Sequence, residues 1–136
     1  MELDAAIDFV REHHRAVLCT TRRDGTPQMS PVTVGVDPGG RLRVSTRLTA
    51  FKVSHVQREP VVRLCVLPDE FFGPWLQITG TAEIIRLPAA MELLVEYYRE
   101  LSGEHPDWDD YRAAMERDQR CIMRITPTAA GPDRSG

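Results

Sequence analysis

The segment of this 136-residue chain with the clearest capacity for chemistry surrounds its single lysine. Lys52 follows Ser45, Thr46 and Arg47, and the pattern predicts a strand that ends at Thr46 and a short helix that begins near Thr49. Free N–H groups at a helix start, beside hydroxyl groups and two cations, are suited to binding an anion. These residues predict a phosphate site. The alternative interpretation is that Lys52 is a solvated helix residue and Thr49 only a helix cap.

The scarcity of lysine supports a specific role for Lys52. The chain has sixteen arginines and one lysine, so an ordinary surface cation in this protein tends to be arginine. A lysine offers a compact ammonium group, whereas arginine offers a planar fork. The count favours a position that needs an ammonium group, although chance survival of one lysine explains it equally well.

No other arrangement of residues predicts a catalytic centre. The chain has no Ser/His/Asp order, no clustered carboxylates and no metal-ligand spacing, so we expect no metal and assign no catalytic residue. Open hydroxyl groups such as Thr33 or Tyr111, or a water molecule, are candidate proton donors. Three cysteines lie singly in apolar segments and are interpreted as buried, reduced thiols: Cys19, Cys65 and Cys121.

The elements that position Lys52 are short strands separated by turn signals. Alternating and β-branched runs predict six strands, at residues 15–22, 27–36, 41–46, 61–67, 75–87 and 121–125. Helical spacing predicts helices at residues 3–12, 47–58, 88–101 and 108–117. This order predicts a mainly β, α+β fold, in which antiparallel strands form a small barrel with short peripheral helices.

Length and composition predict one domain at residues 1–127, followed by a polar, Gly- and Pro-rich segment at 128–136 that we expect to be a flexible C-terminal tail. The net charge of -3 argues against a nucleic-acid partner. No apolar run approaches the ~20 residues that span a bilayer, and the N-terminus lacks the features of a secretory signal. We therefore expect no membrane partner and a cytoplasmic location.

Several motifs together resemble a known family. The spacing of Ser45-Thr46, Lys52, Val56 and Glu59-Pro60 resembles the phosphate-binding segment of the pyridoxamine-phosphate-oxidase-like split β-barrels. Further agreement comes from residues 16–20, 24–28, 80–83 and 103–112. The last of these is most similar to the branch that uses the deazaflavin coenzyme F420. The resemblance covers nearly the whole chain up to Thr128.

The resemblance implies a six-stranded antiparallel split β-barrel that forms a homodimer with cofactor sites at the interface. The Lys52 segment then binds the phosphate, and Trp75 lines the ring or substrate space from the partner subunit. The implied activity is hydride transfer between reduced F420 and a small unsaturated organic substrate. The implied strand beneath the tricyclic ring comprises Met29, Ser30, Pro31 and Val32. As alternatives, Pro31 is an edge-strand proline and Trp75 fills a core or an interface.

Two departures from the family pattern limit what the resemblance implies. Ala50 stands where related proteins often carry an arginine or serine, so one phosphate contact is absent or Arg47 supplies it from another angle. Residues 128–131 replace an aromatic that often ends the family's chain, which puts a tail contact in doubt. Two alternative functions stay open: an FMN-binding oxidoreductase of the same fold, and a non-catalytic F420- or flavin-binding protein.

Overall fold

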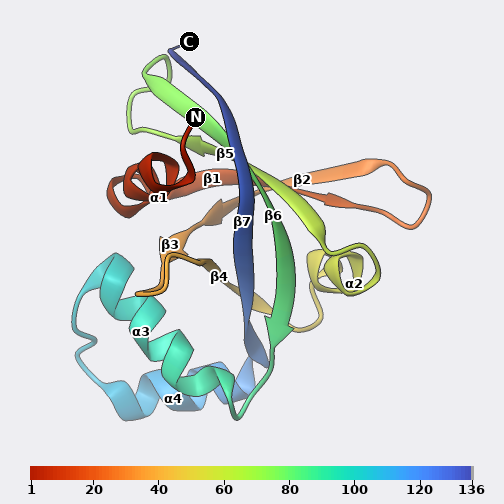
Figure 1. Cartoon of the computed structure of the whole chain (residues 1–136). Helices are drawn as coiled ribbons and strands as arrows, with labels where there is room; N and C mark the ends of the chain where they lie inside the picture. The colour runs from red at the N-terminus through yellow and green to blue at the C-terminus, as the bar shows by residue number, and fades with distance from the viewer. Residues whose placement is uncertain (136) are drawn as a thin grey trace.

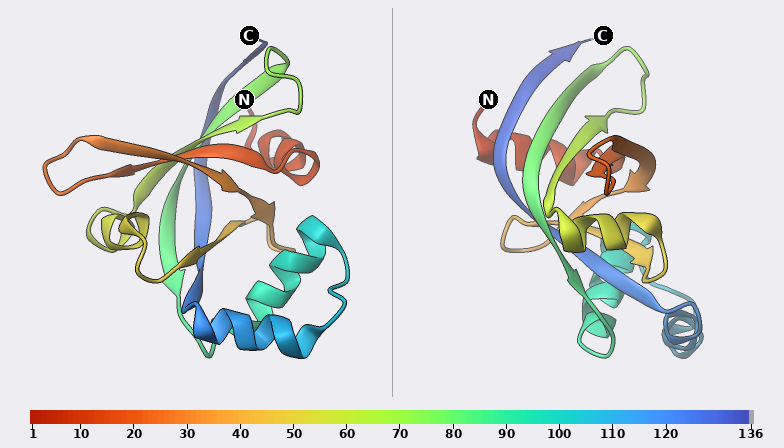
Figure 2. Two further views of the ribbon diagram at one scale, coloured as in Figure 1. Left: turned by 180° about the vertical axis from the view of Figure 1, so that it is seen from behind. Right: turned by 90° about the vertical axis from the view of Figure 1, so that its right-hand side faces the viewer.

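The computed structural model describes residues 1–135 as one curled, seven-stranded sheet with four helices (Figure 1). The strand order is β2-β1-β5-β6-β7-β4-β3, and each neighbouring pair is antiparallel. The strands are β1 (Arg15–Thr21), β2 (Pro27–Thr33), β3 (Gly35–Val36), β4 (Leu42–Arg47), β5 (Val61–Leu67), β6 (Pro74–Ile85) and β7 (Arg120–Ser135). Because β2 and β3 stand at opposite ends of this order yet follow each other in sequence, the sheet curls into an open barrel (Figure 2).

The predicted fold class is confirmed: the chain is mainly β and α+β, with a split-barrel architecture. The strand count differs, because the predicted strand at residues 27–36 divides at Val34. The Val34 N–H group donates to the His14 carbonyl at 2.7 Å, just beyond the β1–β2 ladder. The next residue, Gly35, pairs instead with Arg43 of β4. One run of extended chain therefore serves two strand partners.

The helices lie around the barrel close to the predicted places, except that α2 begins later than predicted: α1 (Leu3–Glu12), α2 (Phe51–Arg58), α3 (Ala90–Ser102) and α4 (Trp108–Arg117). Helix α1 packs Ala6 and Val10 into the main core, while α3 and α4 form a second cluster against Ile122 of β7. Asp107 caps α4 as predicted, accepting a hydrogen bond from the Asp110 N–H group at 3.1 Å. Within residues 1–135, no helix combines the length and apolarity needed to span a bilayer.

A group of charged side chains fixes α3 against the sheet. Glu100 accepts hydrogen bonds from the Val36 N–H group at 2.7 Å and from Arg43 Nε at 3.0 Å. Arg43 is buried and also donates to Glu96 at 3.2 Å. Gly35 leaves the space that the Glu100 carboxylate occupies, since a Cβ atom there would collide with it. These contacts set the position of α3, which in turn carries Tyr97.

The predicted flexible tail is wrong for residues 128–135. They continue β7 and pair with β6, where Ala130 lies opposite Ile78 and Ala129 opposite Thr79. The physical reason is the length of β6, whose edge would otherwise present unpaired N–H and C=O groups. Gly131 adopts a φ of 127°, a conformation that suits glycine and accommodates the shift in register along this pair. Gly136 lies outside the described residues.

Candidate functional site

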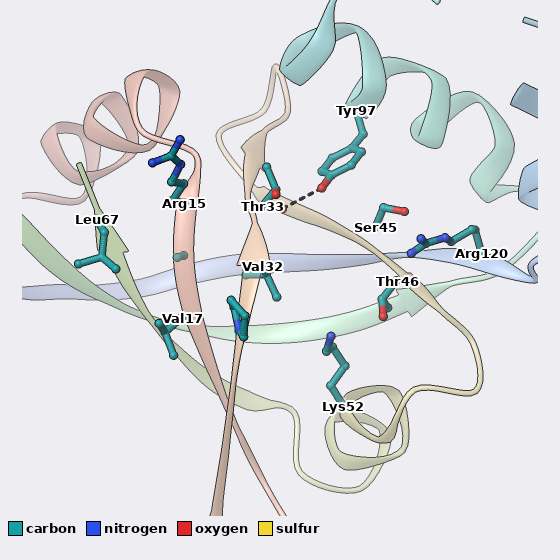
Figure 3. Close-up of a pocket in the computed structure, with 12 residues that line it drawn as sticks. Arg15, Val17, Val32, Thr33, Ser45, Thr46, Lys52, Leu67, Tyr97 and Arg120 are labelled. Carbon is teal, nitrogen blue, oxygen red and sulfur yellow. Dashed lines mark hydrogen bonds between the residues drawn. The ribbon is translucent and has the colours of Figure 1, made fainter. Parts of the chain in front are cut away.

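A cleft of about 490 Å³ opens among β1, β2, β4, α2 and α3, with one residue each from β5 and β7 (Figure 3). One end carries Lys52, Arg120 and the hydroxyl residues of β4, and the other carries Arg15 and Leu67. Apolar side chains lie between the two ends. The full lining is Arg15, Ala16, Val17, Pro31, Val32, Thr33, Ser45, Thr46, Lys52, Leu67, Tyr97 and Arg120.

Lys52 extends from the first turn of α2 toward Thr46 and the cleft (Figure 3). Among residues 1–135 it forms no ion pair, so its charge has no carboxylate partner there. The predicted cap by Thr49 is wrong: Ala50 occupies the N-cap position, and no side chain accepts a hydrogen bond from this helix start. The end of the helix that carries Lys52 therefore lacks a side-chain acceptor.

Arg120, the first residue of β7, brings a second cation to the same end of the cleft. Its Nε atom is fully buried and has no hydrogen-bond partner, the one such side-chain nitrogen or oxygen in the described chain. Leaving a charged donor unpaired and buried is costly. Arg120 nevertheless lines the cleft together with Lys52, so an anion bound there meets two cations, and the residues here fit a phosphate group.

Arg47, which the sequence analysis placed in the site, lies directly opposite Arg120 in the β4–β7 register. It is exposed and does not line the cleft. Sequence reasoning missed Arg120 because it lies in a polar stretch before a strand, with no motif around it. Only the pairing of β7 with β4 brings it beside the Ser45–Thr46 segment.

The hydroxyl residues of β4 lie beneath Tyr97 of α3. Thr46 is buried, and its carbonyl accepts a weak hydrogen bond from Cys121 Sγ at 3.4 Å. The Tyr97 hydroxyl donates to the Thr33 carbonyl at 2.8 Å, which connects α3 to β2 across the cleft (Figure 3). Burial raises the pKa of Tyr97 above its usual value, which is already high enough to keep the phenol protonated at neutral pH.

Residues 29–32, the strand segment predicted to run beneath the cofactor ring, are divided between the cleft and the outer surface. Pro31 and Val32 line the cleft, whereas Met29 and Ser30 do not, and Met29 is largely exposed. Strand β2 forms one end of the sheet order, with β1 as its ladder partner. Pro31 is therefore an edge-strand proline that also contacts the cleft, which joins the two interpretations of this residue.

Trp75 lies outside the cleft. It is the second residue of β6, and it lines a separate apolar hollow of about 270 Å³ with Cys65, Leu67, Phe71 and Phe72. Leu67 belongs to both the hollow and the cleft. Within one chain, the structure thus brings together five of the nine predicted site residues: Ser45, Thr46, Lys52, Pro31 and Val32.

Tyr111 is not an open hydroxyl, contrary to the prediction. Its hydroxyl donates to the Leu94 carbonyl at 2.8 Å inside the α3–α4 cluster, and burial raises its pKa to about 12. Thr33 does line the cleft. Cys121 is buried, as expected, but Cys19 and Cys65 are only partly buried. No three metal-ligating side chains gather anywhere in residues 1–135.

Comparison with known proteins places this geometry in a family. Three solved structures share the fold: the conserved hypothetical protein Rv2991 from Mycobacterium tuberculosis (21% identity, TM-score 0.79, covering 99% of this chain and 85% of that one), an F420 reductase (23%, 0.70, 91% and 94%) and the heme storage protein HutZ from Vibrio cholerae (16%, 0.72, 100% and 98%). The family model for pyridoxamine 5'-phosphate oxidase matches residues 3–131. The chain therefore belongs to the pyridoxamine 5'-phosphate oxidase family.

Proposed function

We propose that this protein is an F420-dependent oxidoreductase, which transfers a hydride between reduced deazaflavin and a small unsaturated organic substrate. The observation that carries the proposal is the cationic end of the cleft, where Lys52 and Arg120 lie without a carboxylate partner in the described chain. A phosphate-bearing cofactor in the cleft would meet both cations, and fold similarity to an F420 reductase is consistent with that choice.

The division of labour follows from the residues of the cleft. When bound, reduced deazaflavin would supply the hydride, and the protein would bind and orient the cofactor and the substrate. Lys52 and Arg120 hold the phosphate, with the Ser45 and Thr46 segment beside them. The middle of the cleft, at Val17, Pro31 and Val32, presents apolar side chains to a bound ring. Met29 and Ser30 complete the strand that we propose to run beneath the ring.

The proposal includes a cytoplasmic homodimer with its cofactor sites at the interface. Large apolar side chains on the surface of the described chain support an interface, because Met29, Phe71 and Phe72 are each more than two-thirds exposed, at 68%, 79% and 73%. Trp75 lies beside these two phenylalanines. In a dimer, Trp75 would reach the ring or the substrate from the partner subunit, as a single chain does not bring it to the cleft.

Two other functions use the same cleft. An FMN-dependent oxidoreductase needs the same phosphate contacts, so Lys52 and Arg120 support it equally. A non-catalytic F420- or flavin-binding protein is supported by the lack of an assigned acid or base, since Tyr111 is committed to the Leu94 carbonyl. The full-length fold similarity to a heme storage protein shows that this fold is also found in proteins named for storage.

Two titrations separate these functions. Purified protein is titrated with F420 and, in parallel, with FMN, and binding is followed by cofactor fluorescence. The proposal expects micromolar binding of F420 and weaker binding of FMN. Protein-catalysed oxidation of reduced F420 by enones or quinones then distinguishes an enzyme from a protein that only binds the cofactor. Preferential binding of FMN with turnover assigns the second function, binding of either cofactor without turnover assigns the third, and binding of neither cofactor rejects all three.

A further inference from the structure

A second hollow, of about 510 Å³, lies beside α2 and near the hairpin that joins β1 to β2. We call it the hairpin hollow. In Figure 1 the hairpin extends away from the barrel, with α2 nearby. The hairpin hollow shares no lining residue with the Lys52 cleft. Its lining consists of Arg23, Ser54, His55, Gln57 and Arg58.

His55 gives this hollow a buried polar group. Its side chain is 8% exposed, and its Nδ1 atom lies 2.9 Å from Thr20 Oγ1 on the core side. The other ring nitrogen, Nε2, has no protein partner in the described part of the chain. In the described chain, Arg120 Nε is the one side-chain nitrogen or oxygen that is both fully buried and without a partner. His55 Nε2 also has no partner, so it must be reached by solvent. His55 Nε2 is therefore available to a ligand in the hollow.

Three arginines surround His55, and none forms an ion pair within residues 1–135. Arg58 donates to the Thr21 carbonyl at 2.9 Å and Arg22 donates to the Pro27 carbonyl at 2.8 Å. Arg23 donates no hydrogen bond within the same residues. Since a guanidinium group carries five N–H donors, most of the donors at this site are free.

The nearby carboxylates are engaged elsewhere. Asp24 in the hairpin accepts hydrogen bonds from Thr26, and Glu59 after α2 accepts one from the Val61 N–H group. Strand β6 also packs against α2, and its one acidic residue, Glu83, is paired with Arg124. Burial and the charges of Arg58 and Arg22 lower the pKa of His55. Asp24 and Glu59 still bring negative charge near the hollow, but neither forms an ion pair with Arg23 or Arg58 within residues 1–135.

We propose that the hairpin hollow binds a phosphate group, either inorganic phosphate or the phosphate end of a small ester. Arg23 and Arg58 match phosphate oxygens through their guanidinium forks. His55 adds a third donor when Nε2 carries a proton, with Thr20 on its opposite nitrogen. This site does not depend on the proposed F420 activity, because the two sites have no lining residue in common.

The test follows the His55 ring by NMR while the full chain is titrated with inorganic phosphate at constant ionic strength and pH 7. The His55→Gln spectrum identifies the signal. We expect a saturable shift of the His55 ring and a higher pKa for it in phosphate. Lys52→Ala retains this response, since Lys52 lies in the other cleft. Arg23→Gln, which removes no hydrogen bond seen in the described chain, weakens binding at least fivefold.

Arg11→Gln is the matched control. It removes the same charge from α1, which contributes no residue to the hollow, and leaves binding unchanged. A linear shift without saturation overturns the proposal, as does equal weakening by the two arginine variants or loss of the response in Lys52→Ala. Glucose 6-phosphate distinguishes the source of the phosphate: tighter binding than inorganic phosphate assigns an ester, and equal or weaker binding assigns the free ion.

Discussion

Lys52 and Arg120 line one end of the same cleft, although Lys52 belongs to the first turn of α2 and Arg120 begins β7. This relationship bears on the phosphate contact that is lost because Ala50 stands where related proteins often carry an arginine or serine. The sequence suggested Arg47 as the compensating cation, but Arg47 is exposed and its register partner Arg120 lines the cleft instead. In the proposed function, Arg120 takes the role of the missing phosphate contact.

The hydrogen bond from the Tyr97 hydroxyl to the Thr33 carbonyl stabilises the cleft between α3 and β2. Tyr97→Phe removes only this donor, and we expect it to lower the free energy of unfolding by about 0.5–1.5 kcal/mol. Urea denaturation followed by circular dichroism measures the change. Tyr98→Phe is the control, because the Tyr98 ring packs in the α3–α4 aromatic cluster and its hydroxyl forms no hydrogen bond within residues 1–135. Equal effects of the two changes would contradict this assignment.

Glu100 holds α3 to the sheet through Arg43 and the Val36 N–H group. Because Arg43 is buried, Glu100→Ala leaves a poorly compensated charge, and we expect a loss of about 3 kcal/mol in the free energy of unfolding. Glu92→Ala, on the same helix, removes a surface pair with Arg112 and costs at most ~1 kcal/mol. The same urea denaturation compares both variants. A cost for Glu100→Ala no larger than that for Glu92→Ala would show that this anchor is dispensable.

The C-terminal half of β7 provides a direct check on strand pairing. Because Ala129 and Ala130 pair with β6, we expect slower hydrogen exchange in this segment than in the Asp24–Gly25 turn, whose ladder ends at Pro27. Hydrogen–deuterium exchange with mass spectrometry resolves the two segments. Exchange in residues 128–135 as fast as in the turn would support the flexible tail that composition suggested.

His55 makes stability depend on pH. Its folded-state pKa is lowered, mainly by burial, so the unfolded chain takes up this proton at a higher pH than the folded chain does. Stability is therefore lost as pH falls below about 6.5, the usual histidine pKa. In phosphate-free buffer between pH 7.5 and 5.5, we expect the free energy of unfolding to decrease, and to decrease less in His55→Gln. An identical pH dependence in the variant would exclude His55 as its source.

Much of the fold was predictable because local signals agreed with the final structure. The bounds of α1 and the cap of α4 at Asp107 follow from apolar spacing and capping chemistry within a few residues of sequence. The division of the second strand at Val34 was not predictable, because it depends on a change of partner from β1 to β4. The C-terminal strand was missed for a similar reason: its glycine and proline content indicates a tail, and its order depends on pairing with β6.

The candidate site divides in the same way. Lys52, Ser45 and Thr46 lie in one continuous segment, so their types and spacing indicate an anion site without any tertiary information. Arg120 enters the site through the long-range pairing of β7 with β4, and Tyr97 enters through the anchoring of α3. Neither long-range contact leaves a local pattern in the sequence.

The most direct test of the central claim is the affinity for F420 of three single variants, measured by fluorescence titration. We expect Lys52→Ala and Arg120→Gln each to weaken binding at least tenfold, about 1.4 kcal/mol. Arg47→Gln removes the same charge as Arg120→Gln at its register partner outside the cleft, and is expected to leave binding within about twofold, some 0.4 kcal/mol. Weakening by Arg47→Gln that equals the effect of Arg120→Gln, or tight binding that survives in both Lys52→Ala and Arg120→Gln, would contradict the account.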